Sequence, residues 1–95
     1  PGSGKRDIVG LWLDQSPLMG GRIMIFRAGG ALFIEMLFKD SSTYKKALVE
    51  KDTPLGQRFD RVEGNRGGDH WVLGSDGVLQ VRDSEGLIAL AKPIE

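Results

Sequence analysis

Short apolar runs alternate with glycine-rich breaks along the whole chain. Breaks such as Gly20-Gly21, Gly29-Gly30 and Gly67-Gly68 recur at regular intervals. This regularity is typical of an antiparallel β-meander, because helices need longer uninterrupted stretches. The pattern predicts about eight strands, over Ile8–Gln15, Arg22–Arg27, Ala31–Lys39, Thr43–Lys51, Gln57–Glu63, Asp69–Leu73, Val78–Arg82 and Leu87–Lys92.

The connections between these strands are short enough for hairpins. Ser75-Asp76-Gly77 predicts a type I′ turn, because Asp-Gly accepts positive φ at both central positions. Strands joined in sequence order favour an all-β fold, an antiparallel up-and-down meander that forms a small closed or nearly closed barrel. One alternative stays open: Tyr44–Lys51 is rich in helix formers, with Asp40 or Ser42 as its cap.

The hairpin Arg22–Lys39 differs from the later strands in having two apolar faces. In the later strands Leu79 and Val81 alternate with polar residues, whereas Ile23 to Phe26 are consecutive apolar residues. A domain of this size must cover the outer face of such a hairpin. The cover is either an intramolecular one, such as the N-terminal segment, or a second copy in a homodimer; a bound ligand is the third alternative.

Length and charge narrow the class of protein. The 95 residues suit one domain, which we place at 7–95 after a disordered tail at 1–6. Thirteen basic residues balance thirteen acidic ones without a basic stripe, so nucleic acid is not an expected partner. The chain has no cysteine, and no apolar run is long enough for a membrane-spanning helix.

Candidate chemistry is sparse. His70 is the sole histidine, and no Gly-x-Ser-x-Gly elbow accompanies it, so we expect no enzyme, although a His70-based enzyme is a minor alternative. No metal or cofactor is expected, because Asp76 and Asp83 fit hairpin turns better than calcium loops. Glu35, the one acid in an apolar run, is expected to pair with an arginine across the strands, for instance Arg22 or Arg27.

The segment Gly10-Leu11-Trp12, followed by the meander, resembles the calycin group of lipocalin-like and avidin-like β-barrels. The final strands, Trp71 to Leu79 and Asp83 to Ala89, resemble small bacterial secreted proteins or lipoproteins. The resemblance implies a structural role for Trp12 as a plug at one barrel end, with Arg82 above it in a cation–π contact. It also implies a periplasmic or secreted location.

These observations predict a non-enzymatic binding or interaction module for a small apolar ligand or a protein partner, with a homodimer through Arg22–Lys39 as one form. A rival class is a hydrolase inhibitor or envelope structural protein that acts through surface loops such as Asn65–Asp69. The predicted ligand-binding residues are Met24, Phe26, Phe33, Met36 and Trp71.

Overall fold

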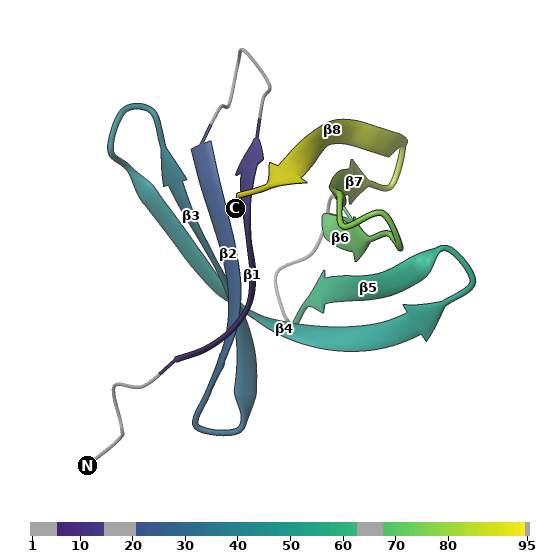
Figure 1. Ribbon diagram of the computed structural model, residues 1–95, viewed down its shortest axis with the longest axis horizontal. Helices are drawn as coiled ribbons and strands as arrows, with labels where there is room; N and C mark the ends of the chain where they lie inside the picture. The colour runs from purple at the N-terminus through teal and green to yellow at the C-terminus, as the bar shows by residue number, and fades with distance from the viewer. Residues whose placement is uncertain (1–5, 15–20, 63–67, 95) are drawn as a thin grey trace.

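Eight antiparallel strands follow one another in sequence order and close into a barrel (Figure 1). The computed structural model describes residues 6–14, 21–62 and 68–94 and has no helix within them. The predicted all-β meander is therefore confirmed. The strands are β1 (Asp7–Asp14), β2 (Gly21–Ala28), β3 (Ala31–Phe38), β4 (Thr43–Thr53), β5 (Gly56–Arg61), β6 (His70–Leu73), β7 (Leu79–Asp83) and β8 (Gly86–Pro93).

The predicted strand bounds differ from the observed ones by a few residues. The barrel domain predicted at 7–95 begins with β1 at Asp7, and the predicted tail lies outside the described residues except for Arg6. Gln15 and Glu63, the predicted last residues of two strands, also lie outside them.

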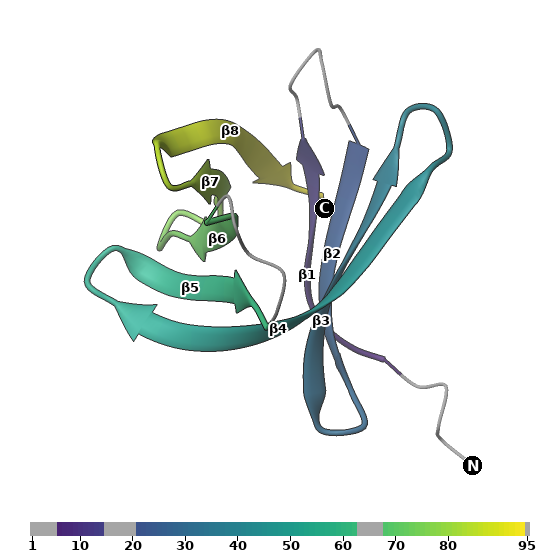
Figure 2. The same cartoon turned by 180° about the vertical axis from the view of Figure 1, so that it is seen from behind.

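The long strand β4 links two halves of the barrel wall. Its residues Thr43 to Leu48 pair with β3, and Leu48 to Thr53 pair with β5. Figure 2 shows this strand sweeping from β3 to β5 along one side of the molecule. The helix considered for Tyr44–Lys51 is wrong, because pairing on both sides outweighs the local helix preference of lysine, alanine and leucine.

A short ladder closes the barrel. In the described residues β1 pairs with β8 from Trp12 to Asp14, opposite Ala91 to Pro93. The amide of Ile94 extends this contact by donating a 2.9 Å hydrogen bond to the carbonyl oxygen of Leu11. The seam is thus much shorter than the ladder between β2 and β3, which runs the full length of both strands.

Side chains that alternate along the strands fill the inside of the barrel. Leu79 and Val81 lie on the inner face as predicted, Leu79 fully buried and Val81 packed against the core. The buried residues that form this core are Trp12, Ile23, Ile25, Leu32, Ile34, Met36, Leu48, Phe59, Trp71, Leu79 and Ala91.

The connection between β6 and β7 is longer than the predicted two-residue turn. Gly77 has a φ of 84°, and its amide donates a hydrogen bond to the carbonyl oxygen of Gly74. The amide of Gly74 in turn donates to the carbonyl oxygen of Val78. Asp76 does not have positive φ, so the predicted type I′ turn is wrong. Its carboxylate instead accepts a 3.0 Å hydrogen bond from the amide of Val78, which satisfies the loop locally.

Candidate functional site

The predicted ligand-binding residues separate into two groups on opposite sides of the barrel wall. Met24 lies opposite Glu35, and Phe26 opposite Phe33, on the outer face of the β2–β3 hairpin. Met36 belongs to the inner face. The hairpin is therefore apolar on both faces, but its two faces cannot contact one ligand together.

Met36 and Trp71 form part of the packed interior. Trp71 is 3% exposed and lies opposite Phe59 on β5 and Val81 on β7. Its indole Nε1 has no hydrogen-bond partner among the described residues, which is uncommon for a buried donor. Both residues fill space between the strands, as side chains do in small barrels.

An aromatic pair on the outer hairpin face is covered by two cations. The rings of Phe26 and Phe33 stack with centroids 5.6 Å apart. The guanidinium of Arg6 lies 4.2 Å from the Phe26 centroid, and the ammonium of Lys45 lies 5.3 Å from that of Phe33. Such contacts are favourable and keep water from the ring faces. The N-terminal segment is one of the covers considered for the outer face of this hairpin. Its residue Arg6 does cover part of that face.

Arg6 is also the partner of Glu35. Its Nη1 lies 3.0 Å from the Glu35 carboxylate and 3.8 Å from the sulfur of Met24. Glu35 thus pairs with an arginine as expected, but this arginine is Arg6 and not Arg22 or Arg27. Arg27 binds Glu50 instead, at 2.6 Å, so the strand register places each glutamate beside a different arginine.

Next to the aromatic pair, an apolar groove runs over β1, β2 and β3. It has a volume of about 390 Å³, and Arg6 reaches two of the residues that line it, Met24 and Glu35. Arg22 and Glu35 line it together with four apolar residues, Leu11, Met24, Leu37 and Ile94. We call this surface the outer groove.

The structure separates Arg82 from Trp12. Arg82 lies opposite His70 on the outer face of β6 and β7, and its guanidinium donates to the side-chain oxygen of Gln80 at 2.8 Å. Trp12 is buried inside, where its Nε1 donates to the carbonyl oxygen of Gly77 at 2.9 Å. The structural role of Trp12 therefore rests on the Gly77 carbonyl and the core, not on Arg82.

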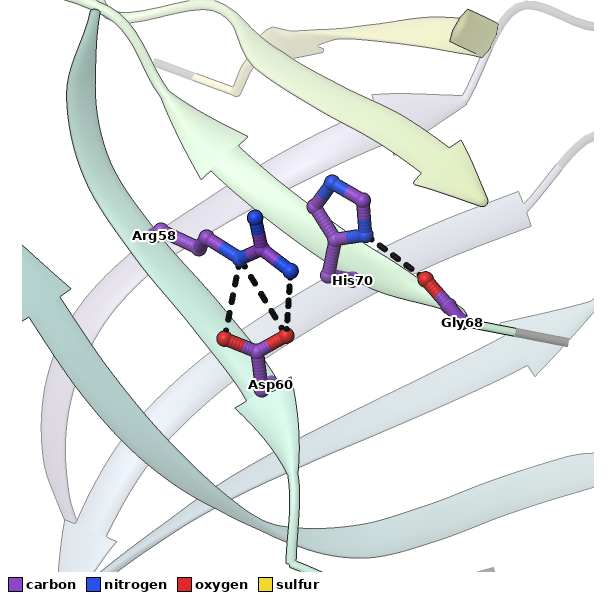
Figure 3. A network of polar contacts seen from close by, with 4 residues as sticks. All are labelled: Arg58, Asp60, Gly68 and His70. Carbon is purple, nitrogen blue, oxygen red and sulfur yellow. Dashed lines mark hydrogen bonds and ion pairs between the residues drawn. The ribbon is translucent and has the colours of Figure 1, made fainter. Parts of the chain in front are cut away.

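A second polar surface covers β5, β6 and β7. Figure 3 shows Arg58 donating hydrogen bonds to the Asp60 carboxylate from Nε and Nη2, with His70 beside them. The hydrogen bond to Asp60 raises the pKa of Arg58. His70 is 9% exposed, and its Nδ1 lies 2.7 Å from the carbonyl oxygen of Gly68, so this contact occupies one ring nitrogen.

The geometry around His70 does not assemble a triad of the Ser-His-Asp kind. Its Nδ1 contacts a backbone carbonyl, whereas a triad needs a carboxylate there to orient the ring. The described residues also contain no group of three or more potential metal ligands within reach of one ion. Those same residues include no helix of the length and apolar character needed to cross a membrane.

The eight-stranded closed barrel is compatible with a calycin-like architecture. No protein-family model, no curated protein and no solved structure matches the chain.

Proposed function

We propose that this protein is a non-enzymatic interaction module that binds through the outer groove, and that its partner there is a second copy of the same chain. The observation that carries the proposal is an open apolar groove on a sheet face whose neighbouring aromatic pair is already covered. Apolar grooves rimmed by charged residues are typical of protein interfaces.

The charge pattern of the outer groove favours a homodimer. Arg22 lies opposite Leu37, and Met24 lies opposite Glu35, in adjacent rows of the β2–β3 ladder. The apolar diagonal from Met24 to Leu37 therefore separates the arginine from the glutamate. A two-fold axis along this diagonal would place the arginine side of one copy against the glutamate side of the other. Arg22 of each copy would then face Glu35 of its mate, whose carboxylate also pairs with Arg6 of its own chain, and the same contact would occur twice, as in an isologous interface.

The packed residues of the interior support an external site over an internal one for binding. Met36 and Trp71 are surrounded by core residues that are almost fully buried. Of the residues predicted to contact a ligand, Met24 remains as a groove residue, while Phe26 and Phe33 border the groove beneath their cations.

Analytical ultracentrifugation over a wide concentration range tests the homodimer. The wild-type chain should sediment as a dimer at high concentration, and Leu37→Asp should shift the equilibrium to the monomer, because a carboxylate would be buried unpaired in the interface. Leu55→Asp is a matched control: Leu55 is 76% exposed and lies in the β4–β5 turn, outside the groove. A wild-type monomer at all concentrations would refute the homodimer.

The charge argument has its own test. Arg22→Glu and Glu35→Arg should each weaken the dimer, and the double exchange should restore part of the loss, because the exchanged charges again face each other. If the double variant is no stronger than the single ones, the proposed two-fold arrangement is wrong.

The location of the protein is also proposed on the basis of sequence. The resemblance of Gly10-Leu11-Trp12 and of the last strands to small bacterial secreted calycin-like proteins supports a periplasmic or secreted setting. Fractionation of the producing cells tests this, and recovery in the cytoplasmic fraction alone would contradict it.

A further inference from the structure

We infer that the outer face of β5, β6 and β7 holds a second binding site, for a small oxyanion such as a carboxylate or a phosphate-type group. The site is a groove of about 570 Å³ whose lining includes Arg58, His70 and Arg82. Strands β5, β6 and β7 lie on the half of the barrel away from β2 and β3 (Figures 1 and 2). The site does not depend on the proposed dimer.

The strand register brings the three donor-bearing side chains together. His70 on β6 lies directly opposite Asp60 on β5 and Arg82 on β7. In the next row on the same face, Val72 lies between Arg58 and Gln80. Paired residues of neighbouring strands are about 5 Å apart at Cβ, so one small anion can reach all three donors.

His70 is the best indication that the groove takes a ligand. Its side chain is about nine-tenths buried, yet among the described residues only Nδ1 has a hydrogen-bond partner, the carbonyl oxygen of Gly68. Because a carbonyl only accepts, Nδ1 carries a proton toward it, and Nε2 is the nitrogen left for the groove. Nε2 donates to an anion there when the ring binds a second proton, since both nitrogens of the imidazolium form are donors. Figure 3 shows Nε2 on the side of the ring that points away from Gly68.

Glycine at position 68 lets the chain pass close to the β7–β8 turn. Gly68 has a φ of +70°, and a Cβ at this position would lie 3.1 Å from the Cβ and the amide nitrogen of Ser84, which also lines the groove. The 2.7 Å contact between Nδ1 of His70 and the Gly68 carbonyl gives the imidazole a defined orientation before any ligand binds, which lowers the entropic cost of binding.

The two arginines have donors to spare. Arg58 uses Nε and Nη2 on Asp60, so its Nη1 has no partner among the described residues. Arg82 uses Nη1 on the neutral side chain of Gln80, so this hydrogen bond does not neutralise its charge. Guanidinium groups bind carboxylates and phosphates through charge-assisted hydrogen bonds, which are about twice as strong as neutral ones.

Acidic residues at the rim set a limit on affinity. Asp83 and Glu85 also line the groove, and the Asp83 carboxylate accepts a 2.8 Å hydrogen bond from the Glu85 amide. Asp83 is thus partly satisfied by the turn, whereas the Glu85 side chain is exposed at the rim. Its charge opposes an anion, so removal of that charge should strengthen binding.

Proton NMR of the His70 imidazole provides the test, because His70 is the sole histidine and its ring signals need no further assignment. The full chain is titrated at fixed pH and ionic strength with sodium sulfate, a tetrahedral dianion, and separately with sodium acetate, against sodium chloride. We expect a saturable shift with sulfate or acetate and none with chloride. Saturation by sulfate alone assigns a phosphate-type ligand, and saturation by acetate alone assigns a carboxylate.

Variants distinguish a built site from general charge attraction. Arg82→Gln should weaken binding about tenfold or more, since a hydrogen bond to a charged group is lost. Arg58→Gln should act in the same direction, and Glu85→Gln should strengthen binding. Arg27→Gln, the same change on β2 and outside both grooves, should leave the affinity unchanged. A linear shift that is equal in all three salts, or equal affinities in the wild type and Arg82→Gln, would overturn the proposal.

Discussion

The indole nitrogen of Trp12 on β1 donates a 2.9 Å hydrogen bond to the carbonyl oxygen of Gly77, which lies between β6 and β7. The two residues are 65 positions apart, so this single contact ties the first strand to the last connection but one. The other tryptophan, Trp71, is buried to the same extent, but its indole nitrogen has no partner in the described part of the chain. The two tryptophans therefore differ in hydrogen bonding and not in burial.

The same substitution at both tryptophans isolates that hydrogen bond. Trp12→Phe removes the donor to Gly77, whereas Trp71→Phe removes a donor that makes no protein contact. Both lose a similar volume, so Trp12→Phe should lower the free energy of unfolding by about 1 to 2 kcal/mol more than Trp71→Phe. Urea denaturation measures the difference, and equal losses would show that the Gly77 contact contributes little.

Gly10 and Trp12 form a tightly coupled pair. A Cβ on Gly10 would lie 2.5 Å from a carbon of the Trp12 ring, so Gly10→Ala must displace the indole. Overpacking of this kind costs about 1 to 3 kcal/mol in the free energy of unfolding. In a Trp12→Phe background the smaller ring leaves room, and the cost of Gly10→Ala should fall by at least about 0.5 kcal/mol. Additive losses in the double-mutant cycle would contradict the steric explanation.

Arg6 should contribute more to stability than a typical surface arginine. It pairs with Glu35 and also lies over the Phe26 ring. Arg6→Ala is expected to lower the free energy of unfolding by about 0.5 to 1.5 kcal/mol, the combined range of an exposed ion pair and an exposed cation–π contact. Arg27 is the matched comparison, because it pairs with Glu50 at a similar exposure. Arg27→Ala should cost less, and a larger loss there would count against the stacking contribution.

The β3–β4 turn should give a local pH dependence. Hydrogen bonds from the hydroxyl and amide of Ser42 lower the pKa of Asp40 below its ordinary value of 3.8. A depressed folded-state pKa stabilises the fold above the unfolded value, and the effect is lost as the pH falls through the folded value. Asp40→Asn should therefore reduce stability at pH 7 but hardly at pH 2. Thermal unfolding at both pH values measures this, and an equal loss at both would exclude the carboxylate charge as the cause.

The order of the strands and the inner faces of the later ones follow from the sequence alone. Glycine breaks limit each run to strand length, and the alternation of Leu79 and Val81 with polar neighbours leaves one possible inner face. The resemblance of Gly10-Leu11-Trp12 to calycin-like barrels implies a structural tryptophan, and Trp12 is indeed buried. The structure adds the steric reason for Gly10, since a Cβ there would collide with the indole.

The tertiary structure decided the matters that depend on distant residues. Local helix preference could not show that Tyr44–Lys51 would pair first with β3 and then with β5. Spacing could not show that Glu35 would bind Arg6 instead of a neighbour in its own hairpin. Nor could it show that Arg82 would lie beside His70, outside the wall that encloses Trp12. Sequence patterns report periodicity within a strand, whereas such contacts depend on register between strands and on the closure of the barrel.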